Sequence, residues 1–252
     1  MNHLKVSIII PIYNTPRKRL EILFSSLQNA WERFKFKDNL TLTLIIVNDG
    51  SKEKATNNFI ESLMYESIEL KKINLKNNVG RSRARNIGIK ELDNGWVTFL
   101  DSDDEVLNNY FETITKYLTK YQGKDQISFG YLINTIPVKR FSLFGPVKYQ
   151  SYRYKGIWST FLRTELLKSN KDLRFEPGLD IGEDSQFLEK VESQLNFDRA
   201  LHVNIPIYNY KFDFKSYKVE NSFKRNLRPI YYRIKYQIVM YFLRTPLISQ
   251  NV

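Results

Sequence analysis

The sequence predicts an α/β protein built on a mostly parallel sheet flanked by helices. Over the first hundred residues, short apolar runs alternate with segments whose apolar residues recur at helical spacing, as in parallel strands joined by helical crossovers. The first run, Val6–Ile10, is continuous and rich in β-branched residues, which is typical of a strand buried on both faces. With 252 residues and 42% hydrophobic content, the chain can form one such domain with a small appendage.

Composition excludes several kinds of site. The chain has no cysteine, which rules out disulfide and thiol chemistry, and its two histidines, His3 and His202, make a multi-histidine metal site unexpected. No apolar run has the length and flanks of a signal peptide or a membrane span, so we expect a cytoplasmic protein. The formal net charge of +12 requires a surface explanation, such as nucleic acid, anionic lipid or phosphorylated ligands.

The first half of the chain contains four predicted strands separated by helices. Pro11 is expected to stop the first strand, and apolar residues from Leu20 to Phe34 form the buried stripe of the helix that follows. Further strands are predicted at Leu42–Val47, Ile68–Leu75 and Trp96–Leu100. Further helices are predicted around Phe59–Met64 and at about Ser82–Leu92.

The pattern is less regular after residue 104. A helix is predicted at Tyr110–Tyr121, a strand at Ile127–Ile133 and a basic, aromatic loop or hairpin at Pro137–Tyr154. The remaining predictions are a short helix at Thr160–Lys168, a helix opened by Gly182, and two short strands near Leu201 and Ile207. We assign residues 1–220 to this sheet domain.

Residues 221–252 differ in composition, and we predict a basic, aromatic C-terminal helical extension there. The segment contains no acidic residue, and its lysines and arginines alternate with Ile, Tyr, Phe and Leu. Two interpretations remain open. The extension binds an anionic membrane surface, or it packs on the sheet domain through a stripe that includes Ile230, Ile234 and Ile238.

Three carboxylates, Asp101, Asp103 and Asp104, follow the strand predicted at Trp96–Leu100. Crowded aspartates repel one another, so they are tolerated best where a cation or hydrogen-bond donors offset their charge. A divalent metal bound to phosphate oxygens is a natural candidate, because magnesium is usually held by one or two protein carboxylates and substrate phosphates. The alternative is an acidic start of the helix at Tyr110, with no ligand.

Three predicted strand ends meet at one edge, because the carboxyl ends of parallel strands share an edge of the sheet. They are Pro11–Asn14, Asn48–Ser51 and Asp101–Asp104. Tyr13 offers a ring on which a base can stack, and Asp49 offers an acceptor for a base or a ribose. Each residue alone is also typical of an ordinary loop or turn. Their joint occurrence at one edge favours a ligand site.

Two predicted helix starts add charged groups. Gly80 opens a helix whose first turns carry arginines, a favourable place for an anion, and Arg85 can reach a base carbonyl or a phosphate. A solvated basic face is the preferred interpretation of Arg81 and Arg83. The two carboxylates that follow Gly182 lie at a predicted helix start, where a favourable interaction with the helix dipole is the alternative to a functional role.

Taken together, these motifs resemble the family 2 nucleotide-sugar glycosyltransferases, whose GT-A fold contains a Rossmann-like sheet. The resemblance covers roughly residues 4–212, and its specificity lies in the order and spacing of the whole set. The matching segments are Val6–Asn14, Val47–Ser51, Asn78–Gly80 with Ala84–Gly88, Asp101–Asp104 and Gly182–Phe187.

The resemblance implies a role for each site residue. Asp103 would hold Mn²⁺ or Mg²⁺ on the diphosphate, and Asp184 would be the catalytic base. The base of the nucleotide would contact Tyr13, Asp49 and Arg85, and its ribose Asp101. The full set of implied nucleotide-binding residues is Pro11, Tyr13, Asn14, Asp49, Gly80, Arg85, Asp101 and Ser102.

Two positions leave alternatives open. The family usually has two consecutive acids where this chain has Asn48 and Asp49, so a neutral amide lowers the negative charge near the nucleotide. Trp158 stands where such enzymes often place a sugar-binding aromatic residue, and a core tryptophan is an equal alternative.

The implied reaction is an inverting, metal-dependent transfer of a sugar from a nucleoside diphosphate sugar, with UDP as the expected nucleotide. The acceptor would be a hydroxyl of a glycan or glycolipid in bacterial surface polysaccharide synthesis, with peripheral contact at the inner face of the plasma membrane. Two other classes stay open, a non-catalytic nucleotide-sugar-binding partner subunit, suggested by Asn48, and a basic nucleic-acid-binding protein. The acids of the predicted cleft would repel nucleic acid, so we expect no such partner.

Overall fold

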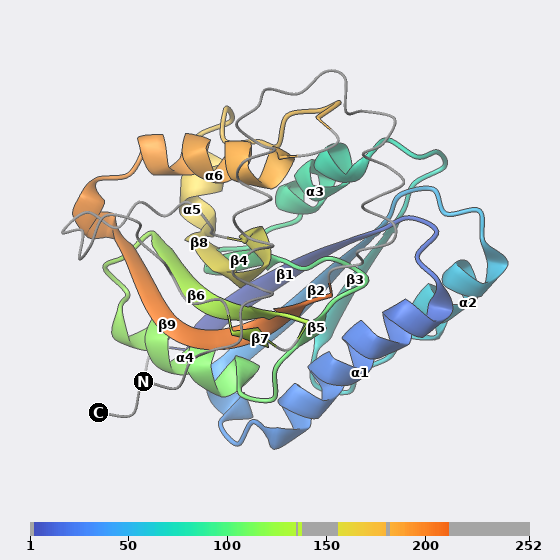
Figure 1. The fold of residues 1–252 in the computed structure, drawn as a ribbon, viewed down its shortest axis with the longest axis horizontal. Helices are drawn as coiled ribbons and strands as arrows, with labels where there is room; N and C mark the ends of the chain where they lie inside the picture. The colour runs from blue at the N-terminus through green and yellow to red at the C-terminus, as the bar shows by residue number, and fades with distance from the viewer. Residues whose placement is uncertain (1–2, 135, 138–155, 180–181, 212–252) are drawn as a thin grey trace, which may run out of the picture. The chain divides into compact units, whose positions relative to one another are not determined.

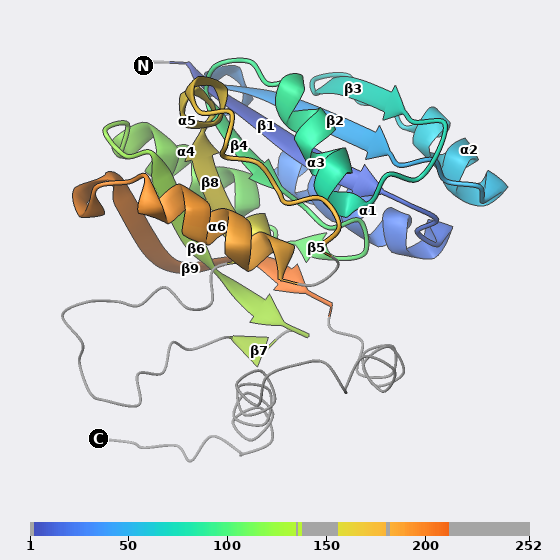
Figure 2. The same cartoon turned by 90° about the horizontal axis from the view of Figure 1, so that it is seen from above.

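The computed structural model describes residues 3–134, 136–137, 156–179 and 182–211, which form a mixed sheet with helices on both faces (Figures 1 and 2). The strands are β1 (Leu4–Ile12), β2 (Leu40–Asn48), β3 (Glu69–Asn74), β4 (Trp96–Phe99), β5 (Glu105–Val106), β6 (Gln126–Ile133), β7 (Ile136–Pro137), β8 (Thr160–Arg163) and β9 (Ala200–Tyr210). The helices are α1 (Arg17–Arg33), α2 (Lys54–Ser62), α3 (Arg81–Lys90), α4 (Tyr110–Lys120), α5 (Thr164–Ser169) and α6 (Glu183–Ser193). Short 3₁₀ helices are η1 (Lys37–Asn39), η2 (Ile157–Ser159) and η3 (Phe197–Arg199). The predicted α/β class is confirmed.

The strand order within the described residues is β3-β2-β1-β4-β8-β6-β9-β5, with β7 paired to β6. Strands β3, β2, β1 and β4 are parallel to one another, as the alternating strands and helices of the first hundred residues predict. Beyond β4 the sheet becomes mixed, because β8 runs antiparallel to both β4 and β6, while β6 and β9 are parallel. The four parallel strands therefore supply the common edge on which the predicted site depends.

Helices cover both faces of this sheet. Figure 1 shows α1, α2 and α4 along one side and α3, α5 and α6 along the other. The apolar stripe predicted from Leu20 to Phe34 is buried, which explains the position of α1 against the sheet. No helix in the described part of the chain is long and apolar enough to cross a membrane. The predicted extension at 221–252 and nearly all of the predicted loop at 137–154 lie outside the described residues.

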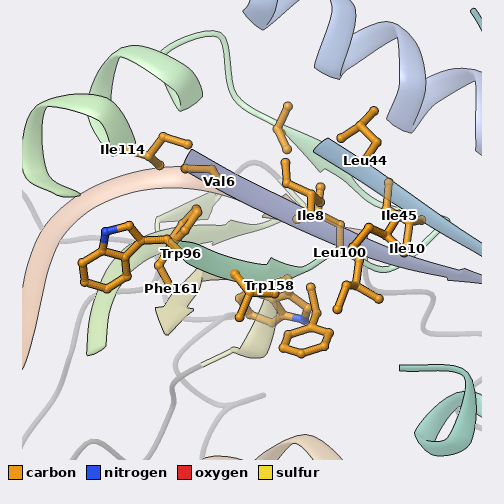
Figure 3. Packing of buried hydrophobic residues seen from close by; sticks show 14 of the residues in the cluster. Val6, Ile8, Ile10, Leu44, Ile45, Trp96, Leu100, Ile114, Trp158 and Phe161 are labelled. Carbon is orange, nitrogen blue, oxygen red and sulfur yellow. The ribbon is translucent and has the colours of Figure 1, made fainter. Parts of the chain in front are cut away.

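The centre of the core lies on β1, whose consecutive isoleucines Ile8, Ile9 and Ile10 are fully buried from both faces. In Figure 3, Ile8 and Ile10 lie beside Leu44 of β2 and Leu100, which directly follows β4. Residues on both faces of one strand are buried only where both faces are covered by helices. The strand ends that carry the polar residues are therefore held on a rigid support.

The first strand continues through Pro11 to Ile12, so the expectation that Pro11 stops it is wrong. The backbone of Ile12 bonds toward β2, where its carbonyl accepts from the amide of Asp49 at 2.8 Å. Because alternate residues bond to opposite neighbours, Pro11 faces the β4 side, where pairing has already ended after Ile9. Its missing N–H therefore costs no ladder hydrogen bond.

Two other predictions fail in the second half of the chain. Thr160–Arg163 forms strand β8 instead of the first turn of a helix, because β4 and β6 both pair with it. Only the following residues, Thr164–Ser169, are helical. The two short strands predicted near Leu201 and Ile207 are one strand, β9, whose pairing with β6 shifts register between Phe129 and Tyr131.

Candidate active site

The three predicted strand ends lie together at the carboxyl edge of β1, β2 and β4. The backbone amide of Asn14, after β1, donates to Ser51 Oγ, after β2, at 3.0 Å. The hydroxyls of Thr15 and Ser102 share a hydrogen bond of 2.7 Å, which joins the segments after β1 and β4. The structure thus brings together the residues that the sequence places at this edge.

Tyr13 is the most accessible of the predicted nucleotide contacts, with 46% of its surface exposed directly after β1. The backbone beside it is fixed by Asn14, which takes the left-handed conformation (φ 46°) that asparagine tolerates. The Asn14 side-chain oxygen accepts from the amides of Lys52 and Glu53 at 2.8 and 3.3 Å. Pro11 lies half-buried near the end of β1. The Tyr13 ring is therefore presented to solvent from a fixed support.

Asp49 has both carboxylate oxygens engaged by the loop that leads into α3. Its oxygens accept from the amides of Val79 at 2.7 Å and Gly80 at 3.0 Å, and from Asn78 Nδ2 at 2.9 Å. Burial raises the pKa of Asp49 above its ordinary value, while the two amides lower it. The observed role of Asp49 is to tie this loop to the end of β2.

Asn48 is explained by a network of side-chain amides. Its Nδ2 donates to Asn57 Oδ1 at 2.9 Å and to Asn74 Oδ1 at 3.0 Å, while its Oδ1 accepts from the amide of Ser51 at 3.1 Å. A carboxylate here would present only acceptors to the two neighbouring side-chain oxygens. The amide is therefore the residue that satisfies this buried position.

Arg85 is the charged centre of the site. It is 1% exposed, and its guanidinium lies over the Phe175 ring at 5.1 Å. Nη2 donates to Asp101 Oδ1 at 2.7 Å, and Nη1 donates to Asp184 Oδ1 at 2.7 Å and to Glu183 Oε1 at 3.2 Å. One buried cation therefore joins the end of β4 to the first turn of α6.

The protonation of Asp184 follows from this cluster. Burial raises the pKa of Asp184 to about 7, the charges of Asp101 and Glu183 act in the same direction, and Arg85 opposes them. Burial alone would lower the pKa of Arg85, but its three carboxylate neighbours raise it above its ordinary value. Arg85 therefore stays charged while Asp184 can exchange a proton near neutral pH.

The three aspartates after β4 occupy different environments. Asp101 faces Arg85, Asp103 is exposed at the rim, and Asp104 is buried. Asp104 accepts from the Tyr208 hydroxyl at 2.7 Å and from the amide of Lys211 at 2.6 Å. Burial, with the charges of Asp101 and Asp103, raises the pKa of Asp104 to about 8. Asp104 thus anchors the end of β9, and Asp103 presents its carboxylate to solvent.

No group of three or more His, Asp or Glu side chains in the described residues is arranged to hold a metal ion. Asp103 nonetheless fits a divalent ion shared with phosphate oxygens, because such ions need only one or two protein carboxylates. Incomplete solvation at the rim and the charge of Asp101 raise the pKa of Asp103, while Arg19 and Arg81 lower it. Two arginines therefore lie within electrostatic range of the same carboxylate.

Trp158 is a residue of the core. It is 8% exposed, stacks on Tyr208 at 5.0 Å and on Tyr210 at 5.5 Å, and meets the edge of Tyr131 at 4.5 Å. Its indole packs against the two tyrosine rings of β9 and fixes their orientation. The alternative of a core tryptophan, not a directly exposed sugar platform, is the one that the structure favours.

Sequence reasoning assigned no role to several residues of this site. Glu183 pairs with Arg85 and with Arg81, and Tyr208 with Lys211 holds Asp104. A signal was available, since Tyr208 and Tyr210 are two residues apart and so point to one face of a strand. Because two short strands were predicted near Leu201 and Ile207, the alternation of residues along a single strand through Tyr208 and Tyr210 was not recognised.

Comparison with known proteins identifies the family. Residues 7–154 match the profile of glycosyl transferase family 2. The chain is 25% identical over 230 residues to glycosyltransferase GlyA of Streptococcus pneumoniae, which covers 82% of this chain and 30% of GlyA. It is 27% identical over 217 residues to the teichoic acid poly(glycerol phosphate) polymerase of Staphylococcus epidermidis, which covers 84% of this chain and 28% of the polymerase. The chain thus spans less than a third of the length of these curated relatives.

Solved structures share the fold. The crystal structure of S. aureus TarS in complex with UDP-GlcNAc superposes with a TM-score of 0.66 at 22% identity, covering 83% of this chain and 59% of the TarS chain. Mannosyltransferase PcManGT from Pyrobaculum calidifontis, in complex with GDP-Man and Mn²⁺, gives a TM-score of 0.56 at 18% identity, covering 86% of this chain and 59% of that one. Because the profile match spans more than half of the sequence, this chain belongs to glycosyl transferase family 2.

Proposed function

We propose that this chain transfers a sugar from a nucleoside diphosphate sugar to a hydroxyl of a carbohydrate acceptor, with inversion at the anomeric carbon. The observation that carries the proposal is the ion-pair cluster of Arg85, which fixes Asp184 beside Asp101 at the strand-end site. Family membership supports the reaction class, and UDP-GlcNAc bound to TarS supports UDP as the nucleotide.

The nucleotide occupies the edge formed by β1, β2 and β4. Tyr13 stacks on the base of the nucleotide. The loop that contains Gly80, which is held by its hydrogen bond to Asp49, borders the base. Arg85 acts through Asp101, which it orients toward the ribose. Asp103 would hold Mn²⁺ or Mg²⁺ at the diphosphate, and the ion would offset the charge of the leaving group.

Asp184 is the base that removes the proton from the acceptor hydroxyl as its oxygen attacks the anomeric carbon. A pKa of about 7 places the group near the optimum for this task, because about half of it is deprotonated at neutral pH and the carboxylate can still take up a proton. Arg85, which also bonds to Glu183, holds the carboxylate of Asp184 in place, so that the nucleophile attacks from the face of the sugar opposite the leaving group.

Substituting Asp184→Asn tests the assignment of the base. The variant should bind UDP like the parent and lose at least a hundredfold in transfer, because the amide cannot accept the proton. Asp172→Asn, at an exposed position, is the matched control and should retain full activity. Unchanged turnover in Asp184→Asn would exclude the catalytic role. UDP-sugar binding by the parent without transfer to any acceptor would favour the partner-subunit alternative.

Substituting Asp103→Asn tests the metal assignment. The exposed carboxylate contributes charge and little packing, so the variant should fold normally and lose the part of UDP binding that Mn²⁺ or Mg²⁺ provides. Calorimetric titration of UDP with and without EDTA measures that part. Equal metal dependence in parent and variant would contradict the assignment.

The acceptor is proposed to be a glycan or glycolipid of a bacterial surface polymer, with the protein at the inner face of the plasma membrane. Support comes from relatives whose names refer to teichoic acid, including the polymerase of Staphylococcus epidermidis and GgaB of Bacillus subtilis. Incubating the protein with radiolabelled UDP-sugars and membrane extracts measures the transfer. Incorporation into no glycan or lipid fraction would count against this acceptor class.

A further inference from the structure

Strand β9 ends beside the acidic turn with two tyrosines on the same face. Tyr208 and Tyr210 are two residues apart, and the indole of Trp158 lies nearly parallel to both rings, at interplanar angles of 8° and 19°. Tyr131, on the neighbouring strand β6, meets the same indole edge-on. The rings of β9 therefore have fixed orientations with little freedom to rotate.

Tyr208 has a structural task. Its hydroxyl donates to Asp104 Oδ2 at 2.7 Å and accepts from the amide of Asp101 at 3.4 Å. The amide of Lys211 donates to the other oxygen of Asp104 at 2.6 Å. These contacts fasten β9 to the acidic turn on both sides of Tyr210. The position of Tyr210 is thus set by its neighbours in the chain as well as by Trp158.

Tyr210 lies in the electrostatic field of both halves of the site. Burial raises the pKa of its phenol above the ordinary value, and the charges of Asp101, Asp104, Asp103 and Asp184 all act in the same direction. The first three follow β4, whereas Asp184 belongs to α6. The phenol therefore lies within electrostatic range of both groups, and its raised pKa keeps it in the protonated form that donates a hydrogen bond.

We propose that Tyr210 donates a hydrogen bond to a ring hydroxyl of the donor sugar and so contributes to the selection of that sugar. The proposal rests on the proposed function, in which the diphosphate lies at Asp103 and the acceptor at Asp184. The sugar that passes between them must lie between these two carboxylates. Tyr210 is the described residue whose phenol is affected by both and whose ring is braced from behind by Trp158.

The test compares binding of UDP with binding of UDP-sugars in the full chain. Tyr210→Phe keeps the stacked ring and removes only the hydroxyl. Its affinity for UDP should match that of the parent, and its affinity for the preferred member of UDP-glucose, UDP-galactose and UDP-GlcNAc should fall about tenfold, as expected for one hydrogen bond. Tyr117→Phe, on α4, is the control, because Tyr117 is also a half-buried tyrosine stacked on another ring.

Three outcomes overturn the proposal, and each has a different meaning. If the ratio of UDP-sugar to UDP affinity is the same in Tyr210→Phe and the parent, Tyr210 does not contact the sugar, and the proposed function stands. If Tyr210→Phe lowers UDP affinity and the melting temperature together, its role is structural. If the parent binds none of these nucleotides, the proposed function fails and the role of Tyr210 fails with it.

Discussion

Arg85 links the geometry of the site to the stability of the fold. It is 1% exposed and faces three carboxylates, of which the side chain of Glu183 is also buried. Removing one partner of a buried ion pair leaves uncompensated charge, and the cost exceeds what the pair itself contributes to stability. The residue that positions Asp184 is therefore also one that the fold depends on.

Arg85→Met should lower the free energy of unfolding by about 3–5 kcal/mol, because it leaves the carboxylates of Asp101, Asp184 and Glu183 without their cation. Urea denaturation measures the change. The matched control is Arg83→Met on the same helix, where the side chain is exposed and the effect should stay within about 0.5 kcal/mol. Equal stability of the two variants would contradict the central role of Arg85.

The pH dependence of transfer should follow Asp184. Because the base acts only when deprotonated and its pKa is raised to about 7, log(kcat/KM) should rise with pH below 7 and level off above it. At pH 6 the rate should be about a tenth of the plateau. Initial rates between pH 5.5 and 8.5 at saturating metal check this. A flat profile across that range would exclude Asp184 as the titrating base.

The turn between β2 and α2 holds together two loops of the proposed nucleotide site. Gly50 has φ +69°, and a Cβ built there would lie 2.4 Å from the backbone carbon of Asn77. Only glycine permits this approach of two loops, which lets Asp49 reach the amides of Val79 and Gly80. Both loops contribute to the predicted nucleotide site.

Gly50→Ala should destabilise the protein by about 2 kcal/mol or more and weaken UDP binding, because the new methyl group forces the loop at Asn77 away from β2. Gly123→Ala provides the control, since a Cβ there meets nothing within 4 Å and its effect should stay within about 1 kcal/mol. Thermal melts with and without UDP separate the two effects. If both variants melt alike, the turn does not require glycine.

Elements were predictable from sequence where their signal is local. Helices α1, α3, α4 and α6 follow from apolar spacing and start signals, and the strand ends follow from the parallel topology. Strand β8 was missed because its identity comes from β4 and β6 on either side, not from its own four residues. Arg85 was identified as a site residue, but its carboxylate partners on α6 lie 98 and 99 positions away, beyond any local pattern.

At the scale of the whole molecule, the net charge of +12 contrasts with the acidic site. Six of the basic residues belong to the segment 221–252, which contains no acid. We propose that this segment holds the protein at an anionic membrane, because each basic residue near such a surface contributes about 1 kcal/mol and aromatic residues add a salt-resistant part. The proposal rests on the composition of residues 221–252.

Replacing the six basic residues of this segment with glutamine should lower sedimentation with phosphatidylserine-containing vesicles at least tenfold. The changed residues are Lys224, Arg225, Arg228, Arg233, Lys235 and Arg244. The control variant replaces six exposed lysines of the sheet domain, Lys18, Lys35, Lys52, Lys76, Lys90 and Lys120. Equal losses in both would indicate a general charge effect, and loss of solubility on truncation at Asn221 would favour the packed-helix alternative.

The separation between Arg85 and α6 also determines the order in which the site is completed during translation. Asp101 lies 16 positions from Arg85, whereas Asp184 lies 99 positions away. At ordinary elongation rates the second partner emerges roughly 5–20 s after Arg85 does. The edge formed by β1, β2 and β4 therefore gains its internal cation early, and Asp184 joins it only after 99 further residues have been added. Ribosome-stalled chains ending before and after α6 should differ accordingly in the protease resistance of α3.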